Sequence, residues 1–166
     1  QIGISARNIV SYEKGEQSPN YGTLENISEV LNFPLSFFED ERDLEFVSSN
    51  SVSFRAFSRL SATQRDSALS ASTLAVDFHD WFESRFNLPT TSIPNLRGYE
   101  PEVAAETVRN EWGLGKKPVK NMIHLIESKG VRVFSLMKES RNIDAFCFWR
   151  KKVPFVFLNT TKSAER

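Results

Sequence analysis

The sequence has 166 residues, of which 40% are hydrophobic and 25% are charged, so it has a globular composition with room for one medium domain or two small ones. Lys and Arg together number 21, as do Asp and Glu, and this balance excludes an overall basic field of the kind that marks many nucleic-acid-binding proteins. No apolar run approaches the roughly 20 residues of a membrane span, and no signal-peptide pattern is found. The single cysteine, Cys147, excludes an internal disulfide and favours a reducing cytoplasm, with its thiol buried as a small hydrophobic group.

Residues 1–40 are expected to form short helices joined by tight turns. Ser5 is a good N-cap for the first of them, and Gly15 is a good stop. With Ser5 as the cap, Ile9 and Tyr12 face inward at helical spacing and short polar side chains face outward. This division is typical of a recognition helix, which presents its first turn to base edges and holds its back against the domain.

The outward side chains of this helix and of the loop after it are the candidate DNA contacts. Arg7 has the forked geometry that reads a guanine edge, Asn8 suits an adenine edge or a phosphate, and Ala6 suits a thymine methyl. Polar side chains further along are expected to contact the DNA backbone. The candidate DNA-binding residues are Ser5, Ala6, Arg7, Asn8, Ser11, Lys14, Ser18 and Asn20.

The stretch "GISARNIVSYEKGEQSPNYGTLENISEVLNF" resembles the latter part of an XRE-family (Cro-type phage repressor) helix-turn-helix domain. The resemblance implies that Ala6, Arg7 and Ser11 read bases, that Asn8 lies beside the backbone, and that two earlier helices would precede this stretch. Residues 1–40 carry two cationic side chains against six acidic ones, which disfavours binding to phosphate. A small helical interaction domain without DNA affinity is therefore the alternative for this segment.

A linker and one long helix are expected next. The polar, serine-rich stretch 41–54 has no clear period, so it is the best linker candidate. Ser61 and Gln64 form a capping-box pattern that begins a helix running to about Phe86. Its small residues favour close packing against another helix. The inward stripe is expected at Ala68, Ala71, Ala75, Phe78 and Phe82.

Helices and strands alternate in the last part of the chain. Pro101 and Pro118 are each expected to open a helix, and Gly130 is expected to stop the second one in a left-handed conformation. The second helix is expected to turn Met122, Ile123 and Ile126 inward. The runs "VRVFSL", "DAFCFW" and "VPFVFLN" predict strands, with "RKK" as a hairpin turn between the last two. The proline near the start of the third run indicates either an edge strand or a strand beginning.

The segments "AAETVRNEWGLG", "IHLIESKGVRVF", "DAFCFW" and "PFVFLNTTKSAER" together resemble the ImmA/IrrE family of zinc metallo-endopeptidases. The long helix before them resembles the connector to a fused XRE domain. The resemblances imply an α+β chain. Its parts are a partial all-α helix-turn-helix segment (1–40), a linker and connector helix (41–98), and the first helices and small sheet of a zincin-like peptidase domain (99–166).

Family membership would also imply a zinc-binding H-E-x-x-H helix after the strands. No such motif occurs, and "KSAER" would be entering that helix, so the zinc ligands and the catalytic base would lie beyond Arg166. His79 and His124 are the only histidines, on different expected helices with no carboxylate at metal-ligand spacing, and we interpret them as surface or packing residues. We therefore assign no catalytic residue, metal ligand or cofactor to this chain, and expect it to lack peptidase activity as given, although the complete family domain would carry zinc.

Both ends of the chain break inside recognisable elements, which predicts a fragment of a longer protein. The leading hypothesis is a DNA-binding transcriptional regulator fused to a metallo-endopeptidase domain that cleaves a repressor protein. The alternative is a non-proteolytic XRE-type repressor or antitoxin-like regulator whose second domain only senses a partner or ligand, and a third is a helical interaction scaffold. The expected partners are double-stranded DNA and a repressor-type protein substrate, with a homodimer as a further possibility and no membrane.

Overall fold

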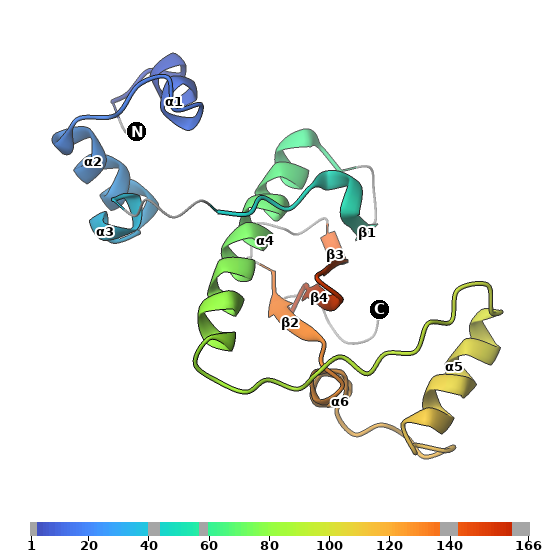
Figure 1. The fold of residues 1–166 in the computed structure, drawn as a ribbon. Helices are drawn as coiled ribbons and strands as arrows, with labels where there is room; N and C mark the ends of the chain where they lie inside the picture. Colours follow the sequence, from blue (N-terminus) through green and yellow to red (C-terminus); the bar gives the residue numbers. More distant parts are fainter. Residues whose placement is uncertain (1–2, 40–43, 57–59, 137–142, 161–166) are drawn as a thin grey trace. The chain divides into compact units, whose positions relative to one another are not determined.

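The computed structural model describes residues 3–39, 44–56, 60–136 and 143–160. The chain divides into two compact units, Gln1–Asp43 and Leu44–Arg166 (Figure 1). Helices and a four-stranded sheet are both present, so the predicted α+β class is confirmed. The stretch "KSAER" lies outside the described residues.

The described residues of the first unit form three helices: α1 (Ala6–Glu13), α2 (Tyr21–Leu31) and α3 (Leu35–Phe38). The predicted cap of α1 is confirmed, because the Ser5 side chain accepts a hydrogen bond from a backbone N–H of the first turn. Gly15 follows the helix with φ of 68°, the left-handed conformation that suits glycine at a helix stop.

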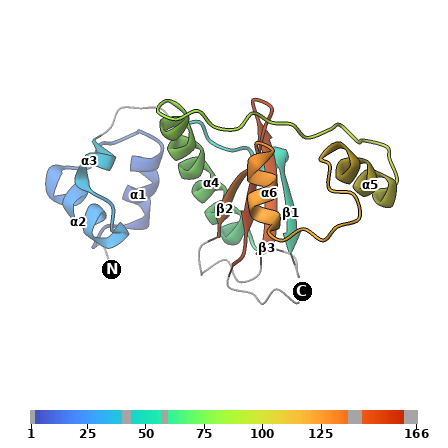
Figure 2. The same cartoon turned by 90° about the horizontal axis from the view of Figure 1, so that it is seen from below.

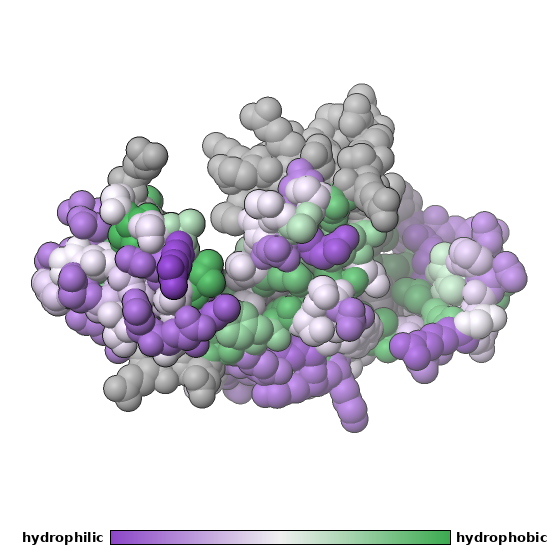
Figure 3. Space-filling view, turned by 90° about the horizontal axis from the view of Figure 1, so that it is seen from above, coloured by the Kyte–Doolittle hydropathy of each residue, from purple (hydrophilic) through white to green (hydrophobic). Residues whose placement is uncertain are grey.

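Packing in the first unit is loose. Among residues 3–39 no residue is buried, and the expected inward side chains Ile9 and Tyr12 are only half-buried. The tightest cluster is made by the rings of Phe33, Phe37 and Phe38, with centroids 4.7 Å apart for the first pair and 5.2 Å for the last. Polar side chains cover most of the face of this unit seen in Figure 3, with apolar ones between them. A unit with so little buried area has a small hydrophobic contribution to its stability.

The second unit is built on one mixed sheet. Its strands are β1 (Val52–Ala56), β2 (Arg132–Ser135), β3 (Ile143–Arg150) and β4 (Val153–Leu158), in the spatial order β1-β3-β4-β2. The β1–β3 and β3–β4 pairs are antiparallel, and β2 runs parallel to β4.

Strand β1 corrects the prediction of a linker over residues 41–54. Val52 and Phe54 alternate with serines, which is the period-2 pattern of a half-buried edge strand. Val52 pairs with Phe148 and Phe54 with Phe146, and a short 3-10 turn, η1 (Ser49–Ser51), precedes the strand. The serines made the stretch look like a loop because they occupy the alternate strand positions.

The hairpin between β3 and β4 follows the sequence prediction. Lys151 and Lys152 have φ of 47° and 70°, the two positive values that a two-residue type I′ turn requires. Pro154 pairs with Trp149, and β2 joins β4 only from Phe155 onward. The proline therefore marks a strand beginning, and the edge-strand alternative is wrong because β4 lies inside the sheet.

Helix α4 (Ala62–Glu83) begins at the predicted capping box of Ser61 and Gln64 and covers one face of the sheet (Figure 2). The covered face consists of stacked phenylalanine rings. Phe146 and Phe157 have centroids 4.5 Å apart, and Phe148 and Phe155 are 5.2 Å apart. These four side chains are at most 3% exposed, so they form the centre of the core.

The face of α4 that packs on these rings differs from the predicted stripe. The buried residues are Ala68, Ser72, Thr73, Val76 and His79, whereas Phe78 is 55% exposed. The partner is a surface of large rings rather than a helix, so small side chains face it. The buried Ser72 hydroxyl donates to the Ala68 carbonyl at 2.8 Å, which removes the cost of burying it.

The opposite face of β3 is more open. Cys147 and Trp149 are both exposed there, so the prediction of a buried Cys147 is wrong. Side chains of a strand alternate between the two faces, and Phe146 and Phe148 occupy the covered face. A continuous run of apolar residues in a strand therefore does not mean that every side chain in the run is buried.

Two further helices complete the second unit, α5 (Pro101–Glu111) and α6 (Met122–Ser128). Pro101 opens α5 as predicted, but α6 begins after an Asn121 cap rather than at Pro118. Met122 and Ile123 are 56% and 39% exposed, so their predicted inward orientation is wrong, whereas Ile126 is half-buried. Helix α6 leads directly into β2 and lies beside it (Figures 1 and 2). Among the described helices, none combines the length and the apolar content needed to cross a lipid bilayer.

Candidate functional site

The first turn of α1 presents the central residues of the predicted DNA contact. Ala6, Arg7 and Asn8 are all exposed there, in consecutive positions directly after the Ser5 cap. The Asn8 backbone N–H donates to Ser5 Oγ at 3.2 Å, which fixes the start of the helix. The arrangement is that of a capped helix whose first turn is open to a ligand.

Glu16, one of the six acidic residues counted in this segment, lies beside two other predicted contacts. Ser11 Oγ donates to Glu16 Oε2 at 3.1 Å, and Lys14 Nζ lies 3.9 Å from Glu16 Oε1. The left-handed turn at Gly15 returns the chain to α1, so the Glu16 N–H donates to the Ser11 carbonyl at 2.9 Å. Glu16 therefore offsets the positive charge of Lys14, which the DNA hypothesis expects to contact the DNA backbone.

The remaining predicted contacts lie in the loop before α2. Ser18 is exposed, and the Asn20 side chain accepts from the Thr23 N–H at 2.9 Å as the cap of α2. The side-chain oxygens of Ser5 and Asn20 thus have helix-capping roles that hold without DNA. A sequence signal for the second cap was present, since Asn precedes the apolar period of α2.

A second candidate site is a charged cluster near the end of α4. His79, Asp80 and Glu83 each offer a ligand atom, and these atoms lie within 4.8 Å of one another. His79 Nε2 is 3.6 Å from Glu83 Oε2. The sequence interpretation denied His79 a carboxylate at metal-ligand spacing, and this is wrong, because Glu83 is four residues further along the same helix.

Two arginines compensate this cluster. Arg150 donates to both Asp80 oxygens at 2.7 and 2.8 Å and to Glu45 Oε2 at 2.6 and 3.0 Å. Arg132 NH2 lies 3.8 Å from Glu83 Oε1. A divalent cation would have to displace these guanidinium partners and would then be repelled by them. The cluster therefore fits a charge network better than a metal centre.

Burial sets the protonation state of His79. The residue is 5% exposed, and its ring lies nearly perpendicular to the Phe155 ring with centroids 5.1 Å apart. Desolvation lowers the pKa of His79 below its usual 6.5, the Arg132 charge lowers it further, and Glu83 and Asp80 oppose the shift. The imidazole is thus neutral near pH 7.

We expect this histidine to make the second unit less stable in mild acid. The unfolded chain takes up a proton at His79 near pH 6.5, whereas the folded chain resists it until lower pH. The free energy of unfolding should therefore be constant above pH 6.5 and fall as the pH drops from 6.5 toward the lowered pKa. Denaturant titrations between pH 7.5 and 5 should show a shallower decrease in His79→Gln, which keeps a donor but cannot titrate. Equal slopes for wild type and His79→Gln would contradict the assignment.

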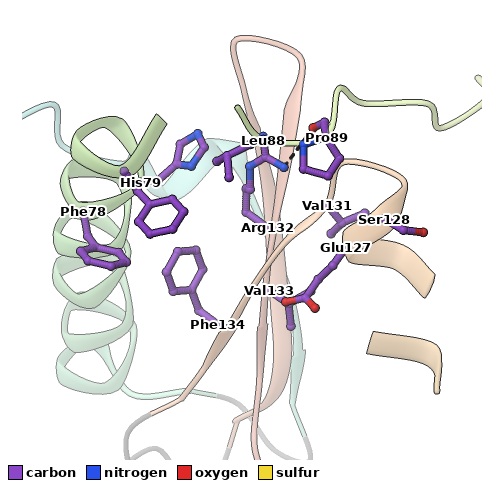
Figure 4. A pocket seen from close by; sticks show the side chains of 11 residues that line it. Phe78, His79, Leu88, Pro89, Glu127, Ser128, Val131, Arg132, Val133 and Phe134 are labelled. Carbon is purple, nitrogen blue, oxygen red and sulfur yellow. Dashed lines mark hydrogen bonds between the residues drawn. The ribbon is translucent and has the colours of Figure 1, made fainter. Parts of the chain in front are cut away.

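An apolar cavity of about 430 Å³ opens beside the charged cluster (Figure 4). It lies between the C-terminal half of α4, the edge strand β2 and the end of α6, and the loop at Leu88 and Pro89 closes one side. Phe78 and Phe134 line it from opposite elements, and Arg132 extends into it from β2. No local pattern in the sequence predicts this cavity, because its walls come from α4 and from the α6–β2 segment, which lie about 50 positions apart in the chain.

The chain was compared with protein-family models, with curated proteins and with solved structures, and it matches none of them. The resemblances to the XRE and ImmA/IrrE families therefore rest on the sequence segments quoted above. A functional proposal is further supported by the exposed first turn of α1 and by the cavity beside β2.

Proposed function

We propose that this chain is part of a cytoplasmic, DNA-binding transcriptional regulator of the XRE type, and that its first unit binds double-stranded DNA through α1. The observation that carries the proposal is the Ser5-capped first turn, with Ala6, Arg7 and Asn8 exposed side by side. An exposed helix N-terminus with a forked cation and an amide is the chemistry that reads base edges in a major groove.

The second unit has a less specific role in this proposal. Its resemblance to ImmA/IrrE peptidases favours a complete protein that cleaves a repressor with the help of zinc. The residues present do not fit that metal, since the H-E-x-x-H motif is missing from the sequence and the carboxylates of the His79 cluster are paired with arginines. We therefore derive no proteolytic step for this chain. The cavity beside β2 favours the second candidate, a regulator whose second unit senses a small molecule.

Arg7 gives the sharpest test of DNA binding. On a DNA site selected from random duplexes with the full-length protein, Arg7→Ala should weaken binding by about 1–3 kcal/mol at fixed salt if Arg7 reads a base. Arg7→Lys should lose most of the same affinity, because a lysine keeps the charge but cannot bind an edge through two parallel hydrogen bonds. If Arg7 contacts only phosphate, Arg7→Lys should bind like wild type and Arg7→Ala should lose affinity equally on all sequences.

Arg97→Ala is the matched control, because Arg97 is an exposed arginine of the second unit. It should bind the selected site with wild-type affinity. The DNA-binding proposal fails if no sequence is enriched in the selection, or if Arg7→Ala binds the selected site as tightly as wild type.

A further inference from the structure

The cavity beside β2 has the dimensions of a small-molecule site. Its volume of about 430 Å³ lies within the range of about 300–1,000 Å³ that is usual for such sites. Most of the wall is apolar, and it comes from α4, the loop at Leu88 and Pro89, the end of α6 and β2 (Figure 4). The apolar lining residues are Phe78, Phe82, Leu88, Val131, Val133 and Phe134.

One strong cation lies within this apolar wall. The Arg132 side chain is 11% exposed, and burial lowers the pKa of Arg132 while Glu83 opposes the shift. The guanidinium keeps its charge all the same, because the ordinary pKa of arginine lies so far above neutrality. A charge held in an apolar wall is costly unless a partner compensates it.

The partners of Arg132 use only part of its binding capacity. NH1 donates to the Pro89 carbonyl at 3.2 Å, as the dashed line in Figure 4 marks. On the other edge, Nε is buried and has no hydrogen-bond partner among the described residues, and NH2 has only the Glu83 carboxylate at 3.8 Å, beyond hydrogen-bond distance. The edge formed by Nε and NH2 is the one that binds a carboxylate through two parallel hydrogen bonds. Glu83 lies near NH2 and forms no hydrogen bond with this edge.

We propose that this cavity binds a small molecule that carries one carboxylate on an aromatic or aliphatic body, with the carboxylate on the Nε–NH2 edge of Arg132. The body lies against Phe78, Phe82 and Phe134. Glu83 is 52% exposed and turns toward solvent when the ligand carboxylate takes its place. The His79 ring is neutral, and Glu127 on α6 is the one carboxylate among the residues that line the cavity. This site is independent of α1 and does not require the DNA-binding proposal.

The experiment uses 4-phenylbutyrate as the probe and 4-phenylbutanol as its uncharged match. Isothermal titration of the chain should show saturable binding of one acid molecule per chain, and the alcohol should bind at least about 10-fold more weakly, because it cannot accept a charge-assisted pair of hydrogen bonds. Acetate has the carboxylate without the body and should bind more weakly than the acid as well.

Two variants locate the binding. Arg132→Gln should weaken binding of the acid by about 10-fold or more, so that its affinity approaches that of the alcohol. Leu88→Trp keeps the Arg132 charge but fills the cavity, so it should weaken binding of both the acid and the alcohol. Arg85→Gln is the control, because Arg85 follows α4, lies over the Trp81 ring and does not line the cavity, and it should bind like wild type.

Circular dichroism shows whether Arg132→Gln is folded. If it is not, the acid–alcohol comparison in wild type and the Leu88→Trp variant decide the proposal. The proposal is overturned if binding of the acid does not saturate or if the acid and the alcohol bind with equal affinity. It is also overturned if a folded Arg132→Gln binds the acid as tightly as wild type. None of these outcomes involves DNA, so each is distinct from a failure of the Arg7 test.

Discussion

Replacing Phe155 by alanine is expected to lower the free energy of unfolding of the second unit by about 3–5 kcal/mol, the usual cost of removing a large buried ring. Phe155 is 0% exposed and lies at the centre of the core. Its ring stacks on Phe148 with centroids 5.2 Å apart and lies nearly perpendicular to the His79 ring of α4, with centroids 5.1 Å apart. The truncation leaves a cavity between two layers that the strands and the helix cannot both close.

Denaturant titration monitored by circular dichroism measures this loss. Trp149→Ala is the matched control in the same hairpin, because it removes a larger ring that is 56% exposed on the open face. It should cost about 1 kcal/mol or less. Comparable losses for the two variants would mean that the core does not centre on the phenylalanine face.

Replacing Gly130 by alanine is expected to cost about 3 kcal/mol or more. Gly130 has φ of 85°, where a side chain is strained, and an added Cβ would lie 2.5 Å from Thr91 Cα and 2.6 Å from the carbonyl carbon of Thr90. These are backbone atoms of the loop before α5, so neither can rotate away, and the strain of the left-handed conformation adds to the clash.

Gly115→Ala separates the two causes. Gly115 also has a positive φ, of 53°, but a Cβ there meets nothing within 4 Å, so only the backbone strain of about 1–2 kcal/mol applies. The midpoint of thermal or denaturant unfolding gives both values. If Gly130→Ala were as stable as Gly115→Ala, the loop at residues 90–91 would not pack against the residue that precedes β2.

Local signals in the sequence predicted the elements that depend on neighbouring residues. The Ser5 cap and the Ser61–Gln64 capping box were predicted correctly, and the predicted "RKK" turn is confirmed at Lys151 and Lys152, while Arg150 belongs to β3. Each of these features is decided within four positions. Strand β1 was missed because pairing with β3, and not its own composition, makes it a strand.

In the candidate sites, too, only contacts between neighbouring residues could be predicted from the sequence. The first turn of α1 was readable because a helix places consecutive residues at known angles, and the i,i+4 pair of His79 and Glu83 was readable for the same reason although it was overlooked. Arg150 and Glu45 are 105 positions apart, and no local pattern relates them. The cavity around Arg132 depends on which strand lies at the edge of the sheet, which the order of strands along the chain does not reveal.

The strand order also has a kinetic consequence. The β3–β4 hairpin has a two-residue turn, so it can close within microseconds, but β1 pairs with β3 across nearly the whole second unit, as in Val52 with Phe148. The chain loses the conformational entropy of closing that long loop before the β1 contacts form to offset it. During synthesis, α4 leaves the ribosome before any residue of β3 or β4 exists, with the face around Ala68 and Val76 still uncovered. The core of this unit therefore condenses late, when its last two strands arrive, and until then the helix depends on its capping box and its own propensity to hold together.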